Sequence, residues 1–313
     1  MNRAPLRCAA RWLRALSLLA GLLAAALPAR GVAAFQVVTT TEGLAALARE
    51  VGGDRVEVQS LSRGIQDPHF VDPNPSLAVK LRRADLLVDV GLELEIGWLP
   101  PLVNQSRNPD IQPGGRRRLT ATSAVVVLER PTGPVDRSQG DIHPGGNPHF
   151  LTDPRRAAEV AAAIAGKLSE LDPAGAATYA ARLADFQKRL GGDSARWLAA
   201  LAPLKGQKVI THHRTLSYFL DWARLAAAGY LEPKPGVPPP PSHLAALVGA
   251  VKAQGVKAIL VENYYDPKSA ELVAKHTGAR VVVIPGDVGG TPEAKSYQAY
   301  LDVLVREVAR AMR

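Results

Sequence analysis

Cysteine is almost missing from this 313-residue chain. The single Cys8 lies near the N-terminus, ahead of the first apolar run, and no cysteine follows it. A lone cysteine excludes an internal disulfide and a metal site built from thiolates. Its position before the apolar run also excludes lipid attachment at the end of that run. Any metal site must therefore use histidine, carboxylate or backbone oxygen ligands.

Long apolar segments are scarce as well. The one extended run covers residues 15–27, which is 13 residues, whereas a membrane-spanning helix needs about 20. Four arginines precede this run, and small residues at 32–34 come directly before Phe35. This layout predicts a secretory signal peptide over residues 1–34 that is cleaved before Phe35, which places the mature protein in the periplasm. A retained membrane anchor is the alternative.

A strong excess of basic charge is missing from the mature chain. Residues 1–34 contain five arginines and no acid, so cleavage lowers the net charge from +9 to +4. The remaining charge gives little support for nucleic-acid binding. The 279 residues from Phe35 onward are enough for one large domain or for two lobes of ordinary size.

Short β-rich runs alternate with helical patterns in the first half. The predicted strands cover residues 36–40, 56–61, 86–90 and 125–128. Thr41 is a predicted helix cap, and Asn74 is predicted to cap a second helix that has Pro75 in its first turn. Alternation of strands and helices predicts a parallel sheet with helices on both faces.

The middle of the chain has a different composition. Residues 154–201 contain mainly Ala, Leu, Arg, Glu and Lys, with no strand pattern. Asp153-Pro154 and Asp172-Pro173 predict two helix starts, and Gly191-Gly192 is expected to weaken the second helix. These residues therefore predict two helices that separate two α/β halves.

The last third repeats the style of the first. The predicted strands cover residues 209–211, 258–261 and 281–284, and the predicted helices cover 218–225, a segment capped by Ser242, 267–278 and 296–312. The predicted fold class is α/β, with two lobes of parallel sheet flanked by helices and joined by a long linking helix. We expect an N-terminal lobe at 35–153, linking helices at 154–203 and a C-terminal lobe at 204–313.

Three histidines and one acid follow predicted strands or precede a helix start. His69 comes after the strand at 56–61, His149 precedes Asp153-Pro154, His213 follows 209–211, and Asp287 follows 281–284. In open α/β sheets, ligands bind beyond the carboxyl ends of the strands. Imidazoles with one carboxylate suit Zn²⁺ in the absence of cysteine, whereas Mn²⁺ would favour more carboxylates. The predicted metal ligands are therefore His69, His149, His213 and Asp287.

Several other residues compete for a role in this site. Glu262 also follows a strand and is the alternative to Asp287, although bulky tyrosines follow it while glycines flank Asp287. His143 is interpreted as a loop residue, with a role in supporting a ligand or at the entrance of the site as the alternative. His212 is expected to point away from its neighbour His213. The remaining polar and aromatic candidates are interpreted as solvated (His243 and His276) or as packing residues (Trp98 and Trp222).

Three segments resemble one family of transport proteins. They are Asp67-Pro68-His69, Asn147-Pro148-His149 followed by Asp153-Pro154, and Thr211-His212-His213 with Tyr218-Phe219 downstream; residues 80–86 also match. Together they resemble the metal-binding substrate-binding proteins of ABC transporters in the zinc and manganese cluster, over residues 35–313. The resemblance implies a rigid helix between two lobes, and we expect the protein to be a monomer. The resemblance also implies a divalent ion held in the cleft by the three histidines and a late acid, then delivered to an ABC permease.

The chain departs from this family pattern in two places. The usual last ligand is an Asp before a short Leu-Gly segment, whereas Asp287 is followed by Val288-Gly289 and is slightly out of register. The long loop rich in His and Asp that many zinc-binding members carry is also missing, and a basic segment at 114–118 occupies that region. Zinc delivery assisted by such a loop is therefore not expected.

Two other functional classes compete with solute capture. An exported zinc hydrolase would leave one coordination position for water and use a nearby general base. The chain contains neither His-Glu-x-x-His nor Gly-x-Ser-x-Gly, and four protein ligands would close the site to water. A surface adhesin on the same scaffold is disfavoured by the lack of a lipid-attachment cysteine. The sequence therefore favours metal capture over catalysis.

Overall fold

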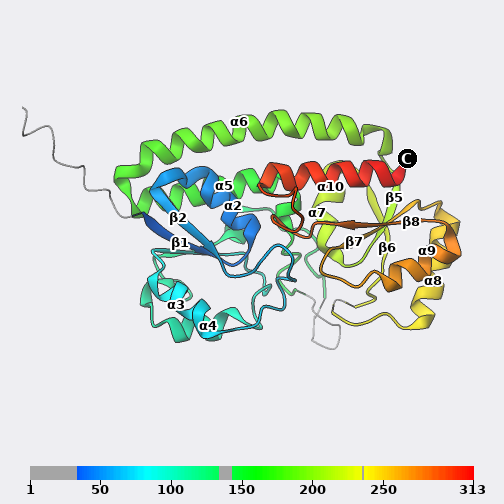
Figure 1. Cartoon of the computed structure of the whole chain (residues 1–313), viewed down its shortest axis with the longest axis horizontal. Helices are drawn as coiled ribbons and strands as arrows, with labels where there is room; N and C mark the ends of the chain where they lie inside the picture. The colour runs from blue at the N-terminus through cyan, green and yellow to red at the C-terminus, as the bar shows by residue number, and fades with distance from the viewer. Residues whose placement is uncertain (1–33, 134–142, 235) are drawn as a thin grey trace, which may run out of the picture. The chain divides into compact units, whose positions relative to one another are not determined.

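The structure is a computed structural model that describes residues 34–133, 143–234 and 236–313 (Figure 1). The predicted signal peptide at 1–34 lies outside these ranges except for Ala34. Residues Ala34–Arg313 form one structural unit that contains two β-sheets. Among the described residues, no helix has the length and apolar character needed to cross a membrane.

The first sheet has four parallel strands. Their order is β2 (Val56–Ser60), β1 (Phe35–Thr39), β3 (Leu86–Asp89) and β4 (Arg118–Thr120). The helices of this half are α2 (Glu42–Gly52), α3 (Pro75–Arg83) and α4 (Leu99–Ser106). As predicted, the Thr41 side chain caps α2 by accepting a hydrogen bond from the backbone N–H of Leu44, and Asn74 caps α3 by accepting one from Ser76.

The second sheet repeats the order of the first. Its parallel strands are β6 (Ala226–Tyr230), β5 (Lys208–Thr211), β7 (Ala258–Glu262) and β8 (Arg280–Ile284). The helices of this half are α7 (Ser217–Ala223), α8 (Pro241–Gln254), α9 (Lys268–Thr277) and α10 (Tyr297–Met312). In each sheet the first strand lies between the second and the third. The direction of the connections therefore changes at this strand, and ligands bind beside such switch points at the carboxyl ends of the strands.

Three sequence predictions about secondary structure were wrong. Residues 125–128 form no strand, and the fourth strand is β4, which pairs with β3 through Leu87 and Arg118. Strand β6 was missed because alanine and glycine have low strand propensity, and pairing with β5 stabilises it instead. Ser242 lies inside α8, which begins at Pro241 without a side-chain cap.

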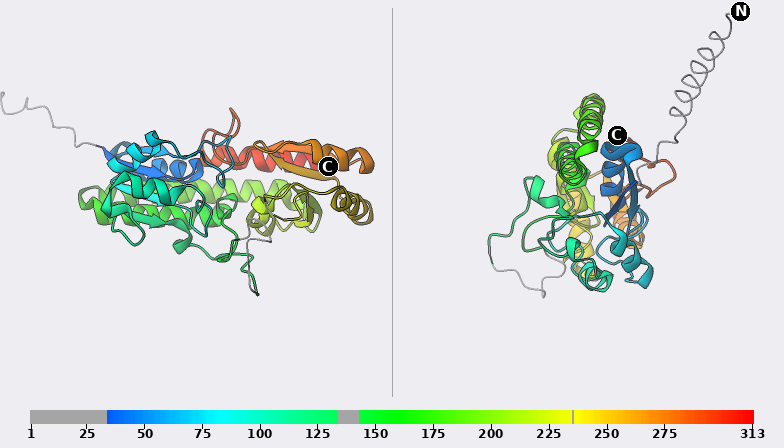
Figure 2. Two further views of the ribbon diagram at one scale, coloured as in Figure 1. Left: turned by 90° about the horizontal axis from the view of Figure 1, so that it is seen from below. Right: turned by 90° about the vertical axis from the view of Figure 1, so that its left-hand side faces the viewer.

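Two consecutive helices link the halves, α5 (Pro154–Leu171) and α6 (Ala176–Leu201). Figures 1 and 2 show α6 extending from the first sheet to the second, and it packs against both α2 and α10. It runs through Gly191-Gly192 without a break. Near its start, the Tyr179 hydroxyl donates to Asp172, and near its end the Trp197 indole N–H donates to Asp302 of α10 at 2.6 Å. Arg55 of the first half donates to the same Asp172 carboxylate at 3.0 Å, so these contacts connect α6 to both halves.

The apolar core is continuous across the two lobes. One cluster joins alternate residues of both sheets, such as Val37, Val88 and Leu260, to the linking helices. The residues that alternate with these along the strands, such as Leu87 and Ile259, belong to separate clusters on the opposite face of each sheet. Each sheet is therefore buried on both faces, as expected for parallel strands.

Candidate metal centre

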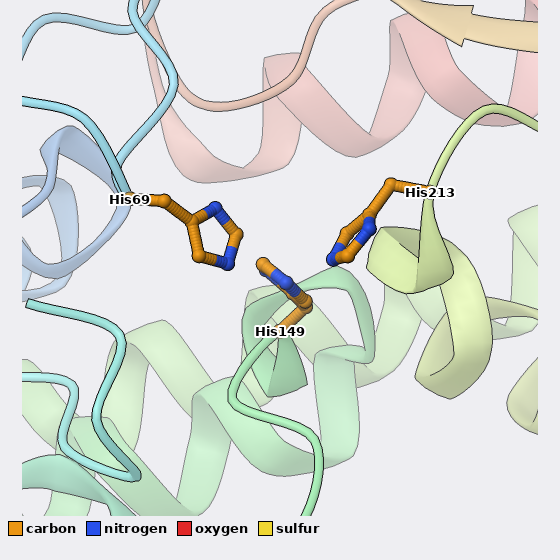
Figure 3. A group of neighbouring side chains, drawn as sticks. All are labelled: His69, His149 and His213. Carbon is orange, nitrogen blue, oxygen red and sulfur yellow. The ribbon is translucent and has the colours of Figure 1, made fainter. Parts of the chain in front are cut away.

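The three predicted histidines converge on one point. His69 lies in the loop after β2, His149 lies just before α5, and His213 follows β5. One ring nitrogen of each lies within 4.8 Å of the others, and the ring centroids are 5.1, 5.3 and 5.4 Å apart. Figure 3 shows the three rings directed toward a common centre. The structure therefore brings together three of the four residues that were predicted as ligands, from segments of both halves of the chain.

Hydrogen bonds to carboxylates determine the tautomers of two of these rings. His69 Nδ1 lies 2.7 Å from Asp67 Oδ1, and His213 Nδ1 lies 3.1 Å from Glu232 Oε2. A carboxylate only accepts hydrogen bonds, so each Nδ1 carries the hydrogen and each Nε2 presents its lone pair. Carboxylate partners of this kind orient metal-binding histidines and raise the basicity of the ligating nitrogen.

The two carboxylates are ionised near neutral pH. Burial by itself would raise the pKa of Asp67, but its hydrogen bonds with the side chain and the backbone of His69 lower it below the usual value. In the same way, hydrogen bonds from His212 and His213 outweigh burial and lower the pKa of Glu232 to about 2. Both groups therefore act as hydrogen-bond acceptors for the rings that they orient.

His149 offers a ligand atom that the protein leaves unpaired. Its Nε2 is buried and has no hydrogen-bond partner among the described residues. Burial, followed by the neighbouring His69, His213 and His143, lowers the pKa of His149 well below the usual value, so the ring is neutral. A buried nitrogen without a partner is costly unless something binds it. A divalent ion at the centre of the group would supply that partner.

Buried aromatic residues position the loops that carry the histidines. The Trp98 indole N–H donates to the Pro68 carbonyl at 2.9 Å, and the Tyr218 hydroxyl donates to the Asn147 carbonyl at 2.8 Å. Each contact lies within two residues of a metal-site histidine. Trp98 and Trp222 are both buried, as predicted for packing residues. The contact by which Trp98 holds the loop of His69 was not predicted from the sequence.

Asp287 does not belong to the histidine group in this structure. Its Oδ2 accepts a hydrogen bond from the Gly43 backbone N–H at 3.0 Å, at the N-terminus of α2, and its Oδ1 accepts one from Val288 at 2.8 Å. A Cβ on Gly43 would lie 2.7 Å from Asp287 Oδ1, so only glycine allows this approach. The residue is partly exposed, but desolvation of its carboxyl raises the pKa to about 6. The carboxylate links the loop after β8 to the first lobe.

Glu262 is the second acid outside the group. It is completely buried at the end of β7, and neither carboxyl oxygen has a hydrogen-bond partner among the described residues. Burial raises its pKa to about 7. An acid in these surroundings is held largely in its neutral form at and below that pH.

The other histidines have distinct surroundings. His212 stacks on Tyr265 with ring centroids 4.0 Å apart and lies outside the metal group. His276 is exposed on α9, as predicted. The prediction that His243 is solvated was wrong, because the ring is half-buried and its Nε2 lies 2.9 Å from the Tyr230 carbonyl. His143, interpreted as a loop residue, lies against His69 with ring centroids 5.4 Å apart.

Comparison with known proteins identifies the family. The profile of the zinc-uptake complex component A family, whose members are described as periplasmic, matches residues 37–311. The chain belongs to this family. It is therefore a metal-binding substrate-binding protein of the ABC-transporter type, which confirms the resemblance inferred from the motifs.

Individual members of the zinc-uptake component A group and its relatives match along most of the chain. The high-affinity zinc uptake system protein ZnuA of Paracoccus denitrificans is 26% identical, over 91% of this chain and 94% of that protein. The manganese ABC transporter substrate-binding lipoprotein PsaA of Streptococcus pneumoniae is 24% identical, over 77% of this chain and 76% of that protein. A crystal structure of ZnuA aligns with a TM-score of 0.74 at 24% identity, covering 90% of this chain and all of that one. The structural match confirms the predicted two-lobe fold.

Proposed function

We propose that this protein captures a divalent metal ion, Zn²⁺ in preference to Mn²⁺, in the periplasm and delivers it to the permease of an ABC transporter. The observation that carries the proposal is the group of His69, His149 and His213, which come from both proposed lobes (35–153 and 204–313) and present ring nitrogens to one point. An ion bound there joins the lobes, and its release requires their separation. The ion is the transported solute and not a resident cofactor.

The preference for zinc is supported by the ligand chemistry. Imidazole nitrogen suits Zn²⁺, whereas Mn²⁺ favours carboxylate and carbonyl oxygen. The two carboxylates nearest the rings, Asp67 and Glu232, are engaged by the Nδ1 hydrogens of His69 and His213. Metal analysis of protein purified from the periplasm, followed by competition among divalent ions, tests the proposal. We expect one equivalent of zinc, and retention of manganese in the presence of equal zinc would contradict it.

The same arrangement argues against an exported zinc hydrolase. A general base must reach the metal-bound water with a free carboxylate or imidazole. Asp67 and Glu232 are committed to the histidines, and both oxygens of Asp287 accept backbone hydrogen bonds. Glu262 is unpaired but lies outside the group of His69, His149 and His213. The remaining free imidazole, His143, lies with its Nε2 3.2 Å from His69 Nε2, which is close enough to bind the ion itself. We therefore propose a binding function without turnover.

The carboxylates that orient the rings provide a prediction of their own. Asp67→Ala and Glu232→Ala should each weaken zinc binding about 10- to 100-fold, because each loses the acceptor that fixes the tautomer and orientation of a ligating histidine. Competition with a chromophoric chelator measures the affinity. Asp266→Ala is the matched control, since Asp266 is exposed and pairs with Lys268. An affinity within about twofold of the unsubstituted protein, for either carboxylate variant, would show that tautomer control is not needed here.

The proposed export predicts a defined N-terminus. Cleavage after Ala34 should leave a mature chain that begins at or close to Phe35. Mass spectrometry of the protein from the periplasmic fraction measures this directly. Recovery of the chain with Met1 intact in that fraction would favour a retained anchor instead.

A further inference from the structure

His143 presents a fourth imidazole to the metal centre. Its Nε2 lies 3.2 Å from His69 Nε2, while its Nδ1 lies 2.8 Å from the Leu92 carbonyl oxygen. Leu92 has a φ of 55°, in the left-handed region that non-glycine residues rarely adopt. The loop beyond His143 packs on the same residue, because a Cβ on Gly145 would lie 2.5 Å from Leu92 Cδ2. The ring is therefore held in place by a specifically shaped segment of backbone.

When both rings are neutral, as metal binding requires, no hydrogen lies between the facing Nε2 atoms of His69 and His143. A carbonyl oxygen only accepts, so His143 Nδ1 carries the hydrogen and His143 Nε2 is a lone pair. The same reasoning with Asp67 makes His69 Nε2 a lone pair. Two lone pairs 3.2 Å apart repel unless a cation lies between them. Two nitrogens bound to one tetrahedral Zn²⁺ at about 2.0–2.1 Å are separated by about 3.3 Å, which matches the observed separation.

The ring positions lead to the same geometry. Four imidazoles on one tetrahedral zinc ion place their ring centroids about 5 Å apart. His69 and His143 are 5.4 Å apart, and the distances within the group of three histidines are 5.1, 5.3 and 5.4 Å. The His143 and His149 centroids are 6.2 Å apart. His143 lies outside the group of three ring nitrogens within 4.8 Å of one another, so its ring must move closer to His149 and His213 for one ion to bind all four imidazoles.

We propose that His143 is the fourth protein ligand, so that the captured ion is bound by four imidazoles and no carboxylate. This proposal rests on the proposed function of the site. It gives His143 the position that the sequence analysis assigned to Asp287, whose two oxygens already accept backbone hydrogen bonds from Gly43 and Val288. Asp67 and Glu232 offset the charge of the ion without binding it, because each is hydrogen-bonded to a ligating histidine, His69 or His213. An all-nitrogen set also strengthens discrimination against Mn²⁺.

X-ray absorption at the zinc edge tests the proposal on the unsubstituted mature protein. The expected spectrum fits four imidazole nitrogens at about 2.0 Å and no carboxylate oxygen. His143→Ala should show three imidazoles and one oxygen from water, with zinc affinity at least about 10-fold lower. His276→Ala is the matched control, because His276 is exposed on α9 and should change neither the spectrum nor the affinity.

The outcomes separate the role of His143 from the function of the site. Zinc bound by three imidazoles and one oxygen, with the oxygen lost or replaced in Asp287→Ala, would overturn the role of His143 and leave metal capture intact. If His143→Ala leaves the zinc affinity unchanged and the spectrum of the unsubstituted protein shows fewer than four imidazoles, the role of His143 is also overturned. A mature protein that binds neither zinc nor manganese would overturn the proposed function itself. Because the spectrum of the unsubstituted protein decides the ligand set, the test does not depend on the folding of the variant.

Discussion

His69→Ala, His149→Ala and His213→Ala are each expected to lower the zinc affinity of the mature protein by at least about 10-fold, more than the loss of a residue that only orients a ligand. Each substitution removes one of the three ring nitrogens that lie within 4.8 Å of one another. His149 is the most stringent case, because its buried Nε2 has no other partner among the described residues. Isothermal titration or competition with a chelator measures the change.

Controls for this prediction come from the same chain. His276→Ala and His243→Ala remove imidazoles that are exposed or bonded to the Tyr230 carbonyl, and neither should affect binding. Pairs of metal-site substitutions should be less than additive, because the second loss acts on a site that is already incomplete. A histidine whose replacement leaves the affinity unchanged is not a ligand.

Acidification should weaken zinc binding, because imidazole must be neutral to coordinate a metal. Burial lowers the pKa of His149 and of His213 in the folded, metal-free protein. Protons therefore compete for these two rings only at a lower pH than for a free histidine, whose pKa is about 6.5. As the pH is lowered, the zinc affinity of the protein should therefore begin to fall at a lower pH than that of a peptide carrying exposed histidines.

Glu262 is expected to make the metal-free protein less stable as the pH rises. Its folded-state pKa of about 7 lies above the ordinary value of 4.5 because burial disfavours the ionised form. Between these two values the folded state holds a proton that the unfolded state has lost, so the free energy of unfolding falls with increasing pH. At about 1.4 kcal/mol for each pKa unit, the loss between pH 4 and pH 8 amounts to about 3 kcal/mol.

Glu262→Gln isolates this effect from the other titrating groups. The variant has no titratable group at this position, so the difference in unfolding free energy between variant and unsubstituted protein should shift in favour of the variant by about 3 kcal/mol from pH 4 to pH 8. Urea unfolding in the presence of a chelator measures it. Glu271→Gln, an exposed position on α9, is the matched control. A difference that stays constant with pH would show that the Glu262 carboxyl is solvated or paired in solution.

Much of the local structure could be predicted because its causes are local. Thr41, Asn74, Asp153 and Ser296 each cap a helix through a backbone group two or three residues away, so a short stretch of sequence contains the whole interaction. The apolar strands could be recognised for a similar reason, since burial on both faces requires continuous hydrophobic runs. Strand β6 lacked such a run and was missed, because its pairing with β5 is a contact between different parts of the chain.

The sequence by itself determined the fold class and pointed to the three histidines, because strand ends in a parallel α/β sheet meet at one edge and His69 and His213 lie in the loops that follow β2 and β5. Only the tertiary structure decided what surrounds them. Asp287 is engaged by Gly43, 244 positions away, and His143 meets His69 across 74 positions. Contacts between residues so far apart in the sequence depend on how the loops pack, to within an ångström. They cannot be predicted from spacing or periodicity in the sequence.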